Sequence, residues 1–207
     1  MRLQLIGRDL SPFVRRTATV IEYLGLPYDR LKLASATEPE KVAAYNRMAR
    51  VPALVLEGGE VLIDSSAIID YLLEIGDPDY TLLPPRGERR RDILRLSAYA
   101  IGVMEKGVAA SYELRRRPRE FVYRPWLDYV EQQIQAGLSV LEENAVDENW
   151  LFGETLTLAD INAVVAYDYI ATVHRKLLSQ DIAVLANLSA RANSMDSFRN
   201  TQWTAEP

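Results

Sequence analysis

Residues 2–16 read RLQLIGRDLSPFVRR and join an apolar, strand-like run to the start of a helix through a serine. Ser11 directly before Pro12 is a common helix start, with serine as the N-cap and proline as the first helical residue. The helix that follows presents one apolar face, formed by Val14, Ala18 and Ile21. A hydroxyl at a helix N-terminus can cap the helix, and it can also stabilise a bound thiolate or another anion. The same geometry serves both roles, so this stretch predicts a strand–serine–helix unit with a candidate site at Ser11.

Short strands and helices continue to alternate up to residue 74. Gly25 and Pro27 end the first helix. The elements expected after it are a strand at 28–33, a short helix at 38–46, strands at 53–56 and 61–63, and a helix that begins at 64. The last two strands flank Gly58-Gly59, which is typical of a hairpin turn. This order predicts an α/β unit.

The pattern changes after residue 76, where two proline-containing dipeptides, Asp77-Pro78 and Pro84-Pro85, indicate a linker. No strand is expected beyond it. The expected helices are at 88–116, at 120–143, from 157 onward, and in shorter pieces to about residue 200. We therefore expect three segments: an α/β domain at 1–76, a linker at 77–87 and an all-helical domain at 88–207.

Composition excludes several classes of protein. The chain of 207 residues is 48% hydrophobic and 26% charged, which is ordinary for a globular protein. We expect no membrane span, because no apolar run approaches about 20 residues. No signal region precedes the first strand, so a cytoplasmic location is expected.

Cysteine is absent and His174 is the only histidine, which excludes disulfides and a protein thiolate and argues against a metal site. The net charge is −5, and the basic clusters at 86–91 and 115–119 flank helices. They therefore indicate solvated helix ends, and we expect no nucleic-acid partner.

Two short motifs in the first domain allow a structural and a functional interpretation. Pro52 lacks an N–H and must lie at a strand start or edge. A trans Val51-Pro52 bond is favoured by the residues alone, since only about 5–6% of such bonds are cis, whereas a cis bond would free the Val51 backbone to pair with a peptide-like ligand. Asp64-Ser65-Ser66 is either a capped helix start or a site where Ser65 holds a carboxylate and Asp64 an ammonium group.

A third motif is interpreted as structural. Thr157 and Asp160 have the spacing of a capping box, and Leu156 and Ile161 have that of a hydrophobic staple. The helix that follows is apolar almost all round, so we expect it at the centre of the helical domain.

Taken together, five segments in order resemble the cytosolic glutathione transferase superfamily, in its serine-type, bacterial-like form. They are Ser11–Arg16, Leu24–Tyr28, Val51–Leu54, Asp64–Ile68 and Phe152–Asp160. The resemblance implies a thioredoxin-like domain followed by a helical domain, a homodimer, and glutathione as co-substrate.

The resemblance also implies roles for single residues. Ser11 would donate a hydrogen bond to the glutathione thiolate without forming a covalent bond. The other implied contacts are Val51 and a cis Pro52 at the cysteinyl backbone, Asp64 and Ser65 at the γ-glutamyl end, Arg50 at the glycyl carboxylate, and Phe13 lining the site. No tyrosine precedes Tyr23 and no cysteine is present, so the tyrosine-type and cysteine-type mechanisms do not apply. Arg47 and Ala49 stand where many members carry proline and glycine.

The implied reaction is attack by the thiolate on a small hydrophobic electrophile, as in detoxification. The electrophile pocket would lie between the domains, lined by Met104, Val108, Tyr112 and Tyr167. Core or dimer packing is the alternative for the first three, which lie on one helix face. Glutathione-dependent peroxidase or isomerase activity, or a non-catalytic binding module, are the alternative functions.

Overall fold

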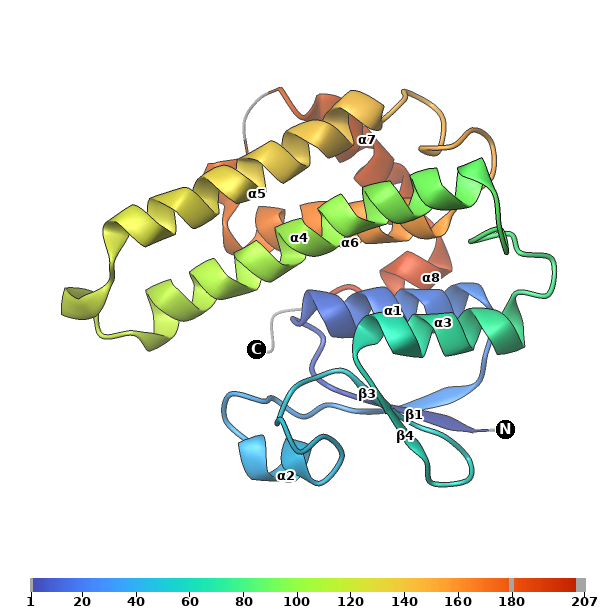
Figure 1. The fold of residues 1–207 in the computed structure, drawn as a ribbon, viewed down its shortest axis with the longest axis horizontal. Coiled ribbons are helices and arrows are strands. Elements are labelled where there is room, and N and C mark those ends of the chain that lie inside the picture. Colours follow the sequence, from blue (N-terminus) through green and yellow to red (C-terminus); the bar gives the residue numbers. More distant parts are fainter. Residues whose placement is uncertain (1, 179–180, 204–207) are drawn as a thin grey trace. The chain divides into compact units, whose positions relative to one another are not determined.

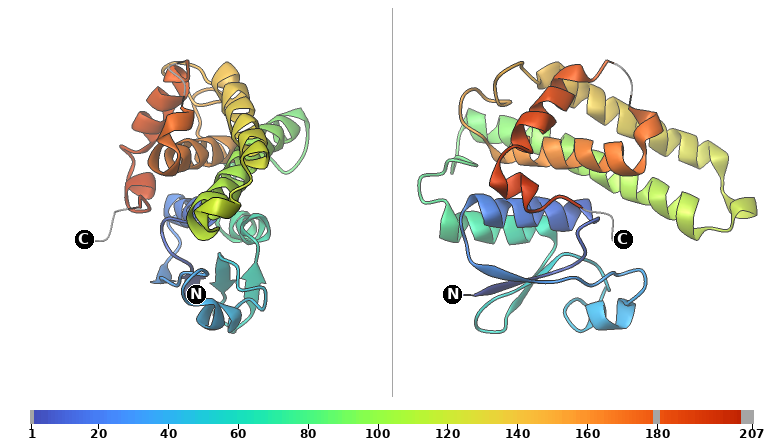
Figure 2. Two further views of the ribbon diagram at one scale, coloured as in Figure 1. Left: turned by 90° about the vertical axis from the view of Figure 1, so that its left-hand side faces the viewer. Right: turned by 180° about the vertical axis from the view of Figure 1, so that it is seen from behind.

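The computed structural model describes residues 2–178 and 181–203, which form two compact units. The first contains residues 2–81 together with 193–203, and the second contains residues 82–192. Figures 1 and 2 show a small sheet with its helices in the first unit and only helices as regular elements in the second. The predicted fold class, an α/β domain followed by an all-helical domain, is confirmed.

A four-stranded mixed sheet forms the centre of the first unit. Its strands are β1 (Leu3–Ile6), β2 (Tyr28–Leu31), β3 (Ala53–Val55) and β4 (Val61–Ile63). They lie in the order β2-β1-β3-β4, with β1 and β2 parallel and the other two pairs antiparallel. The parallel pair needs a crossover, which helix α1 (Pro12–Tyr23) supplies. The antiparallel pair β3–β4 is the hairpin that the sequence predicts.

The sheet separates two layers of helix. Helix α1 and helix α3 (Ser65–Gly76) contact each other on one face, and α2 (Pro39–Ala43) lies at the other (Figure 1). The α2 side is closed by an apolar cluster of Ile6, Leu33, Val42 and Ala53. Every residue of α1 from 14 to 21 is buried, because α3 and the short helix α8 (Asp196–Arg199) also contact it. The sequence predicts one apolar face for this helix, whereas the structure buries every residue of it from 14 to 21.

The second unit is a helical bundle whose main contacts join α4 to two other helices. Its helices are α4 (Glu88–Arg116), α5 (Arg124–Asn144), α6 (Leu158–Val173) and α7 (Ala183–Ala192), with short 3₁₀ turns η1 (Arg119–Phe121) and η2 (Arg175–Leu177). Helix α5 begins later than the predicted residue 120, because the chain first forms η1. The Glu113 carboxylate then accepts the Tyr123 N–H at 3.0 Å, which fixes the turn into α5.

The predicted capping box at the start of α6 is present. The fully buried Asp160 carboxylate accepts the Thr157 N–H at 2.8 Å and its hydroxyl at 2.7 Å, and the Leu151 N–H at 2.7 Å. Burial raises the pKa of Asp160, and these donors oppose that effect. Because these donors lie in the loop before α6 and at its N-cap, Asp160 ties that loop to the helix, which is a structural role.

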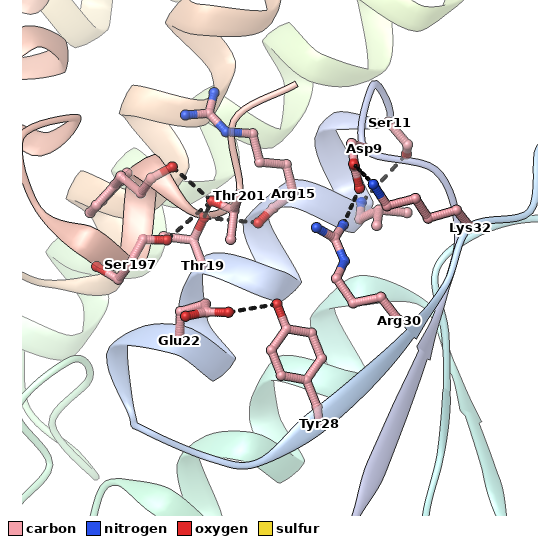
Figure 3. A network of polar contacts seen from close by, with 12 residues as sticks. Asp9, Ser11, Arg15, Thr19, Glu22, Tyr28, Arg30, Lys32, Ser197 and Thr201 are labelled. Atoms are coloured by element: carbon pink, nitrogen blue, oxygen red, sulfur yellow. Dashed lines mark hydrogen bonds and ion pairs between the residues drawn. The ribbon is translucent and has the colours of Figure 1, made fainter. Parts of the chain in front are cut away.

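The chain returns to the first unit after α7. The Arg15 guanidinium donates to the Asn193 side chain at 3.0 Å. The hydroxyls of Thr19 and Thr201 lie 2.9 Å apart (Figure 3). Phe198 is fully buried. Residues 193–203 thus pack with α1, whereas we expected the helical domain to continue to 207. Among the described residues, no helix has the length and apolarity needed to cross a membrane.

Candidate functional site

Ser11 is the N-cap of α1, as predicted. Its backbone is extended (φ −69°, ψ 120°), its carbonyl accepts the Arg15 N–H at 2.9 Å, and its hydroxyl oxygen accepts the Val14 N–H at 3.4 Å. In that last bond the serine oxygen is the acceptor, so the hydroxyl hydrogen can still be donated to another group. The half-buried Ser11 therefore combines a cap with a donor at the positive end of a helix.

The loop before Ser11 is held by a carboxylate between two cations. Asp9 forms ion pairs with Arg30, at the end of β2, and with Lys32, whose Nζ lies 2.8 Å from it (Figure 3). The side chains of Asp9 and Arg30 are mostly buried, at 13% and 19% exposed. A buried, doubly paired carboxylate fixes the end of β1 relative to β2, and with it the position of Ser11.

Gly7 brings the first turn of α1 against the segment around Val51. A Cβ atom on Gly7 would lie 2.4 Å from Val14 Cγ2 and 3.0 Å from Val51 Cβ, and its φ of +139° disfavours any side chain. Val51 therefore lies beside the start of α1, in the same unit as Ser11.

The Val51–Pro52 peptide bond is cis. The trans form favoured by the residues alone is wrong, and the cis form implied by the resemblance is correct.

The segment before Pro52 is clamped by a buried asparagine. The Asn46 side chain donates to the Arg50 carbonyl at 3.0 Å and accepts the Met48 N–H at 3.0 Å. Ala49 has a φ of +52°, in the left-handed region that favours glycine. The chain therefore keeps a tight loop here without the proline and glycine that many glutathione transferases carry, and Asn46 supplies the fixing bonds.

The third part of the site is the start of α3. Asp64 is its N-cap, with a φ of +67°, and its carboxylate accepts the Ser66 N–H at 2.9 Å. Ser65 is 4% exposed, and its hydroxyl oxygen accepts a hydrogen bond at 2.9 Å from the Arg16 guanidinium of α1. Asp64 lies at the surface.

The structure thus gathers Ser11, Val51 and Ser65 around the N-terminal half of α1. Phe13 is half-buried in the same turn and Arg50 is exposed before the cis bond. The sequence assigns no role to Arg16. Its apolar spacing marks only one face of α1, so no local signal shows that this arginine is buried.

The predicted pocket residues of the helical unit have different environments. Met104 is fully buried, Val108 and Tyr167 are half-buried, and Tyr112 is 47% exposed with the Arg116 guanidinium 4.3 Å from its ring centre. Met104 is therefore a core residue of this unit.

A cavity of about 400 Å³ in the same unit lies elsewhere. Its lining comes from α5 and from the chain around η2 and the start of α7, and includes Leu138, Glu142 and Ile182. Residues 2–178 and 181–203 contain no group of three or more histidine, cysteine, aspartate or glutamate side chains able to hold a metal ion.

Comparisons with known proteins agree on one family. Residues 5–79 match the model of the glutathione S-transferase N-terminal domain, and residues 116–194 match that of the C-terminal domain. A maleylacetoacetate isomerase of Pseudomonas aeruginosa is 30% identical over 170 residues, which cover 79% of this chain and 78% of that protein.

Solved structures are similar over nearly the whole chain. A glutathione S-transferase of Methylobacterium radiotolerans in complex with glutathione sulfonate has a TM-score of 0.91 at 26% identity, covering 100% of this chain and 97% of that one. A glutathione transferase family member of Pseudomonas fluorescens with bound glutathione has a TM-score of 0.85 at 30% identity, covering 98% of this chain and 100% of that one.

Proposed function

Because this chain belongs to the glutathione S-transferase superfamily, we propose that it binds glutathione and activates its thiol for attack on a small hydrophobic electrophile. The observation that carries the proposal is the Ser11 hydroxyl, which caps α1 through its oxygen and keeps its hydrogen for another acceptor. Val51 lies beside the same helix start, and two similar structures were solved with glutathione or its sulfonate. These findings support a peptide-thiol site at the start of α1.

The proposed chemistry is a change in thiol acidity. A free thiol has a pKa of about 8.5, so only a few per cent is thiolate at neutral pH. Donation from Ser11 and the positive end of α1 favour the charged form, which lowers the pKa and raises the fraction of nucleophile. The thiolate sulfur then forms a bond to the electrophilic carbon, and a leaving anion departs with the bonding electrons. Ser11 keeps its proton and forms no covalent bond.

The remaining residues would bind the tripeptide. In this proposal the Val51 backbone pairs with the cysteinyl residue beside Pro52, and Asp64 and Ser65 hold the γ-glutamyl end. Arg50 reaches the glycyl carboxylate and Phe13 lines the site. The electrophile would meet Val108, Tyr112 and Tyr167 of the helical unit, whereas the burial of Met104 favours a role in packing.

Isomerisation is the second candidate reaction, supported by the similarity to a maleylacetoacetate isomerase. The same thiolate would add to a conjugated cis double bond, allow rotation about the resulting single bond, and leave again. Glutathione would then be returned unconsumed, which separates this reaction from conjugation: a cis-enone substrate would isomerise with no loss of free thiol.

We also propose that the protein is a homodimer, because dimers are typical of the family, and that it is cytoplasmic, since a chain without cysteine needs no oxidising compartment. A homodimer would have twice the 23.4 kDa mass of the chain in light scattering.

Retention on immobilised glutathione and conjugation of a generic aryl halide test the proposed function. Because the chain contains no cysteine, all thiol consumed in the assay comes from glutathione. We expect both retention and conjugation, or retention with isomerisation of a cis-enone. A folded protein that neither binds the resin nor turns over either substrate would contradict the enzyme proposal and leave a binding module.

A further inference from the structure

Arg16 is a charged side chain in the interior of the first unit. It lies on α1, five positions after Ser11, and only 2% of its surface is exposed. Burying a guanidinium is unfavourable unless polar partners surround it. The partners therefore indicate what this residue does.

The guanidinium reaches across to the start of α3. Its Nη1 lies 2.9 Å from the Ser65 hydroxyl oxygen and 3.3 Å from that of Ser66. Arginine can only donate, so the oxygen of Ser65 is the acceptor and its hydrogen points elsewhere. Arg16 therefore orients Ser65 as a donor towards a further group.

Arg16 also places a positive charge behind the first turn of α3. Burial lowers its pKa to about 10, an effect that Asp64 opposes, so the side chain stays charged at neutral pH. Its charge is screened less by solvent than a surface charge would be. The charge adds to the positive end of the α3 dipole, and both favour an anion at this helix start.

We propose that Arg16 is the positioning residue for the γ-glutamyl α-carboxylate of glutathione, acting through the Ser65 hydroxyl and through its own buried charge. The inference rests on the proposed glutathione site and deepens it. Ser11 and Arg16 lie on one helix, so α1 fixes the separation between the place where the thiol is activated and the place where the carboxylate is held. Sites built on one rigid element keep such separations accurately.

The alternative is that Arg16 only ties α1 to α3. If the role were purely structural, loss of Arg16 would weaken the binding of every ligand of the site alike, since the whole start of α3 would shift. A positioning role acts only on a ligand that carries the α-carboxylate. The two roles are therefore separated by a ligand that differs in this one group.

The experiment is a cycle of protein variants and ligands, measured by titration calorimetry. The ligands are glutathione and γ-aminobutyryl-cysteinyl-glycine, which lacks the α-carboxylate. The proteins are the wild type, Arg16→Met, Arg16→Lys and the control Arg2→Lys, whose side chain is 75% exposed at the far end of β1. Circular dichroism and the thermal midpoint report whether each variant is folded.

We expect the wild type to bind glutathione about 10- to 100-fold more tightly than the analogue, the range of a hydrogen bond to a charged group. Arg16→Met should lose most of that preference, because its affinity for glutathione falls while its affinity for the analogue stays the same. Arg16→Lys keeps a charge without the planar fork and should lose part of it. Arg2→Lys should bind both ligands as the wild type does.

An equal loss of affinity for both ligands in the Arg16 variants would overturn the inference and leave the proposed function intact. A wild type that binds neither ligand would overturn the proposed function, and the inference with it. If Arg16→Met does not fold, Arg16→Lys decides, and an unchanged preference for glutathione in that variant would contradict the role of the guanidinium fork.

Discussion

At the scale of single residues, His174 is separate from the candidate site. It is 4% exposed in the helical unit, and its Nε2 lies 2.8 Å from the Gly107 carbonyl oxygen and 2.9 Å from the Ser111 hydroxyl. A carbonyl only accepts, so Nε2 carries the proton. Burial lowers the pKa of His174, although the Gly107 bond opposes this; Arg115 and Lys176 lower it further and Glu131 raises it.

This environment predicts a loss of stability in mild acid. The unfolded imidazole titrates near 6.5, and the folded one at lower pH, so below about pH 6.5 the unfolded state binds more protons. The free energy of unfolding should therefore fall as pH decreases through 6.5. Urea unfolding at several pH values measures this slope.

His174→Gln is the matched variant, because it removes the only imidazole in the chain. Its unfolding free energy should depend less on pH between about 7.5 and 5.5 than that of the wild type, because the imidazole that binds a proton more readily in the unfolded state is gone. The same slope in both proteins would show that His174 is not its source.

The candidate site was partly predictable residue by residue. Ser11 as N-cap followed from Ser-Pro, a local signal. The cis state of Val51–Pro52 did not follow, because long-range packing decides between two isomers that differ little in free energy. Arg16 was missed since apolar spacing marks only one face of α1, whereas α3 and the C-terminal segment cover the others.

At the scale of elements, close packing between α4 and α5 predicts opposite effects for two glycines. A Cβ on Gly137 of α5 would lie 2.5 Å from Val103 Cγ2 of α4, whereas a Cβ on Gly102 of α4 would meet nothing within 4 Å. Alanine favours a helix over glycine by about 1 kcal/mol, and overpacking costs about 1–3 kcal/mol.

Gly102→Ala should therefore raise the free energy of unfolding by about 0.5–1 kcal/mol. Gly137→Ala should lower it by up to about 2 kcal/mol, which is the overpacking cost of about 1–3 kcal/mol less the helix gain of about 1 kcal/mol. Denaturant unfolding of both variants measures the two signs. Stabilisation by Gly137→Ala would mean that α4 and α5 are not as close as described.

Helices were predicted best where several local signals agreed. The predicted helix at 88–116 has the same bounds as α4, because its periodic pattern lies between Gly87 and Pro118, which mark its two ends. The start of α5 was missed because the bond from Tyr123 to Glu113 spans ten residues and has no local signature.

At the scale of the whole molecule, the C-terminal segment completes the first unit. Helix α8 contacts α1, and its Phe198 is fully buried. Truncating a buried phenylalanine costs about 3–5 kcal/mol. Phe198→Ala should destabilise the protein by that amount, as measured by urea unfolding.

Trp203→Ala is the control, because that side chain is 40% exposed. Its effect should stay below about 1 kcal/mol. A similar small effect of Phe198→Ala would contradict the packing of 193–203 with α1. Sequence could not predict this return, since a helix of four residues carries no periodic pattern.

The proposed stabilisation of the bound glutathione thiolate by the Ser11 hydroxyl underlies the whole mechanism. It is tested by titrating the ultraviolet absorbance of that thiolate in the wild type, Ser11→Ala and Ser11→Thr, each saturated with glutathione. We predict a thiol pKa at least about one unit below the free value of about 8.5 in the wild type and Ser11→Thr, and a return towards 8.5 in Ser11→Ala. Equal pKa values in the wild type and Ser11→Ala would contradict the proposed stabilisation.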